Sequence, residues 1–259
     1  ANCNRSGEKQ MHIMLISHQS ILNYVDKLSK VKVDAWKAVS GRFKSIELNT
    51  SPSQTYEITS RVIKKNDEWF EDYSSEQSKK ILLEESYQKW RKKRAFSDLT
   101  DEELKRVVWG CYPMHPITTF LLPKISEKIA QNERTLFTFL SAEGQKHTLP
   151  DFLKTPFVDS LPLMMPDKIF DYFEPLFKAD GYDRPTHKLW KTATVALSKL
   201  QKTQILEAKI IKTIALIYIF DRLDILAPNI ETIIAIYGND ATKALTALTG
   251  ELKKGFTAP

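Results

Sequence analysis

The stretch Tyr112–Leu140 reads YPMHPITTFLLPKISEKIAQNERTLFTFL, and the rest of the chain is organised around it. Apolar residues recur at every fourth position in its first half, at Ile117, Leu121, Ile125 and Ile129. This spacing predicts an amphipathic helix with one buried face. Pro116 suits the first turn of such a helix, where a missing N–H costs nothing. Pro123 lies within the stripe and predicts either a kink or the start of a second helix.

A polar step, Gln131-Asn132-Glu133-Arg134, separates this apolar stripe from the aromatic block around Phe137 and Phe139. Charged side chains between two apolar segments mark a place where a buried surface meets a charged group. The stretch therefore indicates a site, although its residues alone leave the kind of site open.

Composition places the chain among ordinary globular proteins. It has 259 residues, 42% hydrophobic and 27% charged, which is enough for two domains or for one domain with an appendage. The net charge of +6 permits a nucleic-acid partner without demanding one. Cys3 and Cys111 lie far apart and without metal-ligand neighbours, which favours a reducing cytoplasm.

Targeting signals are missing from the sequence. It contains no apolar run of about 18 residues, so we expect no membrane span. Its first residues, ANCNRSGEK, lack both a methionine and the pattern of a signal peptide. We therefore expect the chain to be the middle or end of a larger protein.

The expected secondary structure changes near Ser51-Pro52. Two short strands, 11–17 and 45–48, precede this point, and every later pattern is helical. Thr100 and Glu103 are spaced as a capping box, and 144–166 reads as a loop-rich segment. We predict a mainly α protein in which a small α/β remnant at 1–51 precedes helical segments 52–143, 144–204 and 205–259. The predicted C-terminal helices are 167–178, 187–202, 205–222, 230–237 and 241–253.

Two features of the α/β segment could carry chemistry. His18 and Gln19 follow the first strand, where open α/β sheets bind ligands, although they could equally cap the next helix. Arg42 stands between Gly41 and Phe43 before the second strand. Its guanidinium suits phosphate oxygens, whereas the simpler alternative is a surface ion pair with Asp34 or Glu47.

Several motifs together resemble one family. They are MHIMLISHQ, Trp36, GRF and SIEL in the first 50 residues, followed by YPMHP, QNERTLFTFL, LWKTATVALSKL and IIKTIALI. Their order is similar to the second half of an AAA+ core and, more closely, to large P-loop ATPases of bacterial phage-defence and DNA-modification gene clusters, relatives of the STAND NTPases. The resemblance covers nearly the whole chain. GRF alone is weakly specific, whereas YPxHP followed by QNERTLFxFL is fairly specific.

One departure from the family pattern is large. The sequence has no G-x-x-x-x-G-K-[ST] loop and no apolar strand that ends in Asp-Glu, so it lacks both Walker motifs. The resemblance therefore implies that ATP and Mg²⁺ are held largely by polypeptide outside these residues. We expect the chain by itself to be inactive as an ATPase. A degenerate protein that has kept the shape and lost catalysis is a further alternative.

The resemblance implies a role for five residues. His18 and Gln19 match the first sensor position, and Arg42 matches the arginine finger that acts across a subunit boundary. Arg134 is the candidate second sensor on the helical lid, and His115 is a second lid residue expected to face nucleotide. Simpler alternatives remain, because Arg134 could pair with Glu133 or Glu127, and His115 could be a hydrogen-bonded turn residue between two prolines.

The C-terminal segment 205–259 resembles a winged helix whose wing is truncated. We expect it to pack against the lid, because few basic side chains lie on its third helix. If the chain binds DNA, the better candidate for the phosphate contacts is the basic run Lys89, Arg91, Lys92, Lys93 and Arg94. Such a run is, however, often just a solvated helix face. We expect a cytoplasmic homo-oligomer or a complex with other defence proteins. The alternative is a helical scaffold that binds DNA or protein without ATPase activity.

Overall fold

The structure is a computed structural model, and it describes residues 14, 16, 29–41, 44, 52–65, 77–130, 133–155 and 162–256. The chain consists of two compact units, Ala1–Asn49 and Thr50–Pro259. The division lies close to Ser51-Pro52, where the sequence pattern changes from mixed to helical.

The first unit contains helix α2 (Lys30–Ser40), which includes Trp36. Of the predicted strand 11–17, the structure describes only Met14 and Ile16. Neither residue is in a strand, and they are 85% and 93% exposed, so the expected buried strand is not seen at these positions. The other residues of both predicted strands lie outside the described residues, and the α/β remnant stays a prediction.

The described residues of the second unit are mainly helical, which confirms the mainly α class. The only β-type pairing among them is an isolated parallel bridge between Met114 and Met164. In chain order its helices are α3 (Pro52–Val62), α5 (Gln77–Arg91), η1 (Arg94–Phe96), α6 (Asp101–Lys105), η2 (Arg106–Gly110), α7 (Pro116–Ala130), α8 (Glu133–Ser141), α9 (Leu149–Leu153), α10 (Asp167–Ala179), α11 (Pro185–Ser198), α12 (Ile205–Phe220), α13 (Ile230–Tyr237) and α14 (Asp240–Phe256).

Local sequence signals set several of these helix ends. The predicted capping box is present, because the Thr100 side chain accepts from the Glu103 N–H while the Glu103 carboxylate accepts from the Thr100 N–H. Asn229 caps α13 in the same manner, accepting from the Thr232 N–H at 2.8 Å. The five predicted C-terminal helices are all present as α10 to α14, with their ends shifted by a few residues. The segment predicted to be loop-rich contains the short helix α9.

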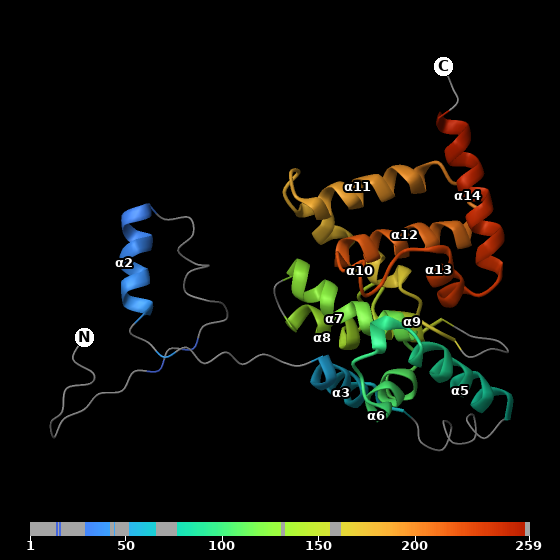
Figure 1. Ribbon diagram of the computed structural model, residues 1–259, viewed down its shortest axis with the longest axis horizontal. Coiled ribbons are helices and arrows are strands. Elements are labelled where there is room, and N and C mark those ends of the chain that lie inside the picture. The colour runs from blue at the N-terminus through green and yellow to red at the C-terminus, as the bar shows by residue number, and fades with distance from the viewer. Residues whose placement is uncertain are drawn as a thin grey trace. The chain divides into compact units, whose positions relative to one another are not determined.

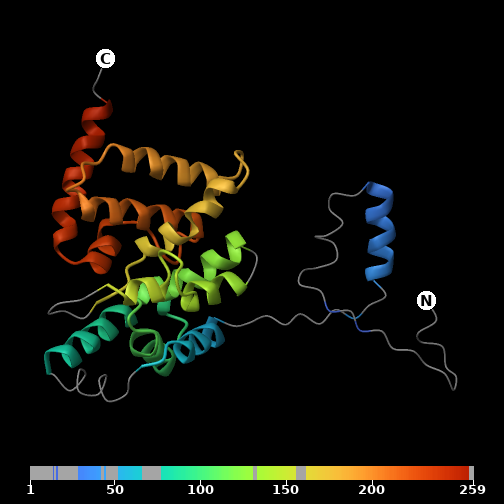
Figure 2. The same ribbon diagram turned by 180° about the vertical axis from the view of Figure 1, so that it is seen from behind.

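Helix α7 lies at the centre of the second unit. It packs against α8, α10, α12 and η2. In Figures 1 and 2 the helices form layers, with α11 and α12 on one side of α7 and α8, and with α3, α5 and α6 on the other. Helix α14 crosses the ends of α11 and α12 and packs on α12 and α13.

The start of α7 is buried on every side. All residues from Cys111 to Leu122 are buried, including Thr118 and Thr119, so this half of the helix is a core helix without a solvent face. The single apolar stripe predicted from the sequence is therefore a correct description of only the second half of α7. Pro123 neither ends α7 nor begins a new helix, because α7 runs through it from Pro116 to Ala130.

Three residues in and next to the turn that leads into α7 form hydrogen bonds with one distant residue, Met164. The Met164 carbonyl accepts hydrogen bonds from the His115 N–H at 3.1 Å and from the Thr118 hydroxyl at 2.7 Å. The Met164 N–H donates to the Pro113 carbonyl at 2.8 Å. A segment about fifty residues away in sequence thereby satisfies backbone groups that would be costly to bury alone.

Helices α3 and η2 approach each other very closely at Gly110. A Cβ atom placed on Gly110 would lie 3.0 Å from the Ser60 Cβ and 3.2 Å from the Arg106 Cγ. Such distances are shorter than ordinary van der Waals contact, so a side chain at position 110 would require Ser60 and Arg106 to shift by a few tenths of an ångström.

One large core joins most of the second unit. Its buried side chains come from α3, α5 to α8 and α10 to α13, and a smaller cluster of Ile210, Ile233, Ala241 and Ala244 seats α14. The predicted boundaries after residues 143 and 204 lie inside this unit, and that finer division stays a prediction. Within the described ranges, no helix combines the length and apolar character needed to cross a membrane.

The capping box predicts a measurable loss of stability on mutation. We expect Thr100→Ala to lower the free energy of unfolding by about 1 kcal/mol, because the Glu103 N–H then loses its acceptor. Chemical denaturation monitored by circular dichroism measures this change. Thr246→Ala is the matched control, because Thr246 is an exposed residue within α14 and alanine favours a helix interior. Equal stabilities of the two variants would contradict the capping role.

Candidate functional site

Three predicted site residues, His18, Gln19 and Arg42, lie outside the described residues. Their roles as sensor and arginine finger stay predictions. The nearest described positions are Ile16, Gly41 and Lys44, all of them exposed.

Arg134 belongs to the first turn of α8, one residue after the helix begins at Glu133. The N-terminal turn of a helix carries a partial positive charge and unpaired N–H groups, which attract anions. A cation in this turn is disfavoured by about 0.3–1 kcal/mol, an effect that Glu133 partly offsets. The backbone position of Arg134 therefore suits an anionic ligand such as a terminal phosphate.

His115 is buried, with 4% of its surface exposed, and it caps α7. Its Nδ1 accepts a hydrogen bond from the Ile117 N–H at 3.1 Å, and its ring meets the Trp90 ring edge-on at a centroid distance of 5.2 Å. This is the hydrogen-bonded turn residue that the sequence offered as the simpler alternative. Its predicted approach to a nucleotide stays a prediction.

Burial also fixes the charge state of His115. Loss of water around the ring, followed by repulsion from Lys89, lowers the pKa of His115 to about 3. The imidazole is therefore neutral at physiological pH. Because Nδ1 accepts from Ile117, the ring proton belongs on Nε2.

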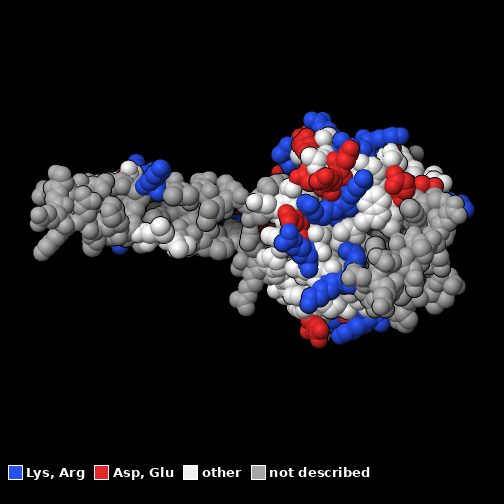
Figure 3. Space-filling view, turned by 90° about the horizontal axis from the view of Figure 1, so that it is seen from below, with Lys and Arg blue, Asp and Glu red and all other residues white. Residues whose placement is uncertain are grey.

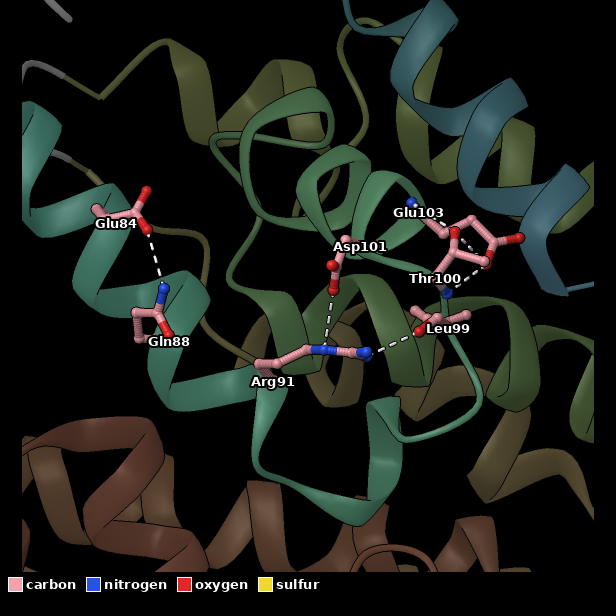
Figure 4. Close-up of polar contacts among 7 residues, drawn as sticks. All are labelled: Glu84, Gln88, Arg91, Leu99, Thr100, Asp101 and Glu103. Atoms are coloured by element: carbon pink, nitrogen blue, oxygen red, sulfur yellow. Dashed lines mark hydrogen bonds and ion pairs between the residues drawn. The ribbon is translucent and has the colours of Figure 1, made fainter.

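Arg91, in the basic run Lys89–Arg94, is committed to contacts within the protein. Figure 4 shows its side chain reaching from the end of α5 toward the start of α6. Its Nε lies 3.0 Å from the Asp101 carboxylate, and its terminal nitrogen donates to the Leu99 carbonyl at 2.8 Å. In the same view Gln88 donates to Glu84, one turn earlier on α5. Arg91 thus holds the α5–α6 connection in place.

The other basic residues of the run are half-buried or exposed. Lys93 forms an ion pair with Glu231 on α13, and the Lys89 ammonium lies 5.6 Å from the centre of the Trp90 ring. Lys92 and Arg94 are exposed. Basic and acidic side chains are interspersed on the face of the second unit shown in Figure 3. The run is therefore not a uniform stripe of free positive charge.

A small pocket lies beside this run, between the end of α5 and the connection from α12 to α13. Its volume is about 220 Å³, and its charged lining residues are Lys93, Arg94, Asp224 and Glu231. Asp224 already pairs with Arg222 at 3.0 Å, and Glu231 pairs with Lys93. Both carboxylates are thus paired with cations, and Arg94 is also close enough to attract Asp224.

One polar cluster, formed around Lys124, contains no residue that the sequence predicts to be functional. The Lys124 ammonium donates a hydrogen bond to the Tyr56 hydroxyl at 3.2 Å and lies 4.0 Å from the centre of the Phe120 ring. The spacing of Phe120 and Lys124 by four residues on α7 could have indicated their contact. Tyr56 lies on α3, and no local pattern connects it with α7.

In the part of the chain that the structure describes, no three His, Cys, Asp or Glu side chains gather closely enough to hold a metal ion. Comparisons of the chain with protein-family models, with curated proteins and with solved structures found no match. The resemblance to P-loop ATPases therefore depends on the sequence motifs alone.

The buried histidine predicts a loss of stability in acid. An unfolded histidine has a pKa near 6.5, so the stability that neutral His115 contributes is fully present above about pH 6.5. It is lost as the pH falls toward 3, by about 1.4 kcal/mol per pH unit. His115→Asn keeps a capping acceptor and does not titrate, so we expect a shallower decline between pH 6.5 and 4. Urea denaturation at several pH values measures both slopes, and parallel slopes would show that His115 is not the acid-sensitive group.

Proposed function

We propose that the chain provides the sensor, arginine-finger and lid side of an ATP site in an AAA+-like P-loop ATPase, of the type found in bacterial phage-defence gene clusters. In this proposal the P-loop comes from polypeptide outside residues 1–259. ATP lies between that polypeptide and the chain, and Arg42 acts on the nucleotide of a neighbouring subunit. Movement of the helical unit would follow hydrolysis.

The position of Arg134 is the observation that carries this proposal. The backbone of Arg134 belongs to the first turn of α8, and an anion near this turn would meet the positive end of the helix dipole. Terminal phosphate oxygens are suitable ligands, because arginine presents several N–H donors in one plane. The residue that the motif QNER singles out thus belongs to a helix turn that favours anions, which supports the proposed phosphate contact.

The core of the second unit supports a lid role. A lid that responds to nucleotide must move as one body, and interlocked cores resist internal deformation. The core cluster connects α8 to α7, α10 and α12 without interruption. A displacement at the start of α8 would therefore be passed to the whole unit.

In this proposal, polypeptide outside the chain holds the Mg²⁺. Because no metal-binding cluster occurs among the described side chains, the ligands of a nucleotide-bound Mg²⁺ would come from the P-loop part.

The alternative function, a DNA-binding scaffold, has weaker support, because Arg91 and Lys93 of the basic run are already paired with acidic residues.

ATP hydrolysis by the complete gene product tests the proposal. We expect Arg42→Ala to lower kcat by at least about 100-fold, because an arginine finger contributes roughly three to five powers of ten. Arg134→Ala should lower kcat by about tenfold, as expected for loss of one charged phosphate contact. Residues 1–259 by themselves should not hydrolyse ATP.

Arg61→Ala is the matched control. Arg61 is exposed and pairs with Glu57 on the same helix, so its loss should leave kcat unchanged within about twofold. The proposal would be wrong for a complete gene product that neither binds nor hydrolyses ATP. Full activity of Arg42→Ala would also overturn it.

A further inference from the structure

Helix α11 carries a surface of one charge sign that has no role in the proposed ATP site. The segment 185–206, which contains α11 and the turn after it, has no Asp or Glu. The whole chain has 32 acidic residues among 259, so an average stretch of this length would contain about three. The segment holds four lysines, and all of them are exposed: Lys188, Lys191, Lys199 and Lys202.

Helical geometry places these lysines in one stripe. Lys199 is the C-cap of α11 and keeps a helical backbone, so Lys188, Lys191 and Lys199 lie within about 80° of one another around the helix axis. The first and last of them are about 16 Å apart along that axis. The opposite face, with Ala193 and Leu197, belongs to the core and packs against α10 and α12. Figures 1 and 2 show α11 at the edge of the second unit, with its outer side away from α12.

Ion pairs and the helix dipole do not account for the whole stripe. No ion pair among the described residues includes any of the four lysines. Lys199 and Lys202 follow the end of α11, where the dipole favours a cation. Lys188, however, lies in the first turn, where the dipole disfavours a cation, and Lys191 adds a like charge on the same face. Helix stability therefore leaves these two lysines unexplained, whereas a polyanionic partner explains all four.

We propose that the outer face of α11 binds the phosphate backbone of duplex DNA. Over about 16 Å a duplex presents about nine phosphates on its two strands, so each lysine of the stripe has a phosphate within reach. The binding is independent of base sequence, because lysine is a point charge and 188–199 contain no Arg, Asn or Gln to read base edges. This surface is separate from the run Lys89–Arg94, in which Arg91 and Lys93 already pair with acidic residues.

An anionic lipid surface is the other large polyanion that a lysine stripe could meet. A helix that lies on a membrane carries bulky apolar side chains next to its basic ones, and these enter the bilayer. Within α11, which the structure describes completely, Val195 is the exposed large apolar residue. Trp190 is half-buried, and its indole N–H donates to Glu174 at 3.2 Å. The face thus lacks an apolar anchor, which favours DNA over a membrane.

Fluorescence anisotropy of a labelled duplex of about 20 base pairs, titrated with the intact chain, tests the proposal. Four phosphate contacts predict a slope of about −3.6 when the logarithm of the association constant is plotted against that of the salt concentration. Affinity should therefore fall roughly a hundredfold between 50 and 200 mM salt. The variant Lys188→Gln/Lys191→Gln/Lys199→Gln removes three contacts and keeps good helix formers. We expect it to bind at least about 100-fold more weakly at 0.1 M salt, with a slope near −1.

A second triple variant separates the position of the charges from their number. Lys64→Gln/Lys92→Gln/Lys146→Gln removes the same net charge from exposed positions elsewhere on the second unit, one of them in the basic run. We expect it to bind DNA within about threefold of the unchanged chain, because distant surface charges are screened by salt. Replacing the three α11 lysines by arginine keeps their charge and should keep the affinity, whereas a structural role of lysine would not survive that exchange.

Three outcomes would overturn the proposal. They are equal losses of affinity in the two glutamine variants, no saturable DNA binding by the unchanged chain at about 50 mM salt, and binding to phosphatidylserine vesicles without binding to DNA. Circular dichroism shows whether each variant is folded, and the arginine variant decides the matter if the glutamine variant is not. None of these measurements involves ATP, so their failure is distinguishable from failure of the proposed ATPase.

Discussion

A turn buried on every side must find partners for its polar groups, and in this protein Met164 forms hydrogen bonds with three residues in and next to that turn. Each unsatisfied N–H or carbonyl would cost about 1–3 kcal/mol, which is a large share of the stability of a typical domain. The carbonyl and N–H of Met164 together serve Pro113, His115 and Thr118. The central helix α7 can therefore begin inside the core, and α8, α10 and α12 pack around it.

The same turn shows why a sequence motif can be specific without being catalytic. In YPMHP, Pro116 begins the helix, His115 caps it and Met114 forms the bridge to Met164. Trp90 packs edge-on against the His115 ring at this turn. Each residue type meets a demand of geometry or burial, so the motif is explained by folding even where its role toward a ligand stays a prediction.

Much of the fold could be predicted from local patterns, because helix ends depend on nearby residues. The Thr100 capping box and the five C-terminal helices follow from spacing and from capping residues alone. The complete burial of the first half of α7 could not be predicted, because the polar residues Thr118 and Thr119 indicate an exposed face. Only the tertiary structure shows that one of them donates its hydroxyl to a distant carbonyl. The contacts of the candidate site were harder still to predict from the sequence. The contact between Lys124 and Tyr56 joins α7 to α3 across 68 residues, and the pairing of Lys93 with Glu231 spans 138. Such contacts depend on tertiary packing, which no local periodicity encodes.

The close approach of α3 to η2 at Gly110 has a consequence for how this sequence can diverge. Because a Cβ at position 110 would lie only 3.0 Å from the Ser60 Cβ, the residues at positions 60 and 110 constrain each other. A relative that carries a side chain at position 110 must make room for it by a change at position 60 or by a small shift of α3. In an alignment of such relatives, these two columns should vary together, and a small residue at one should accompany a larger one at the other.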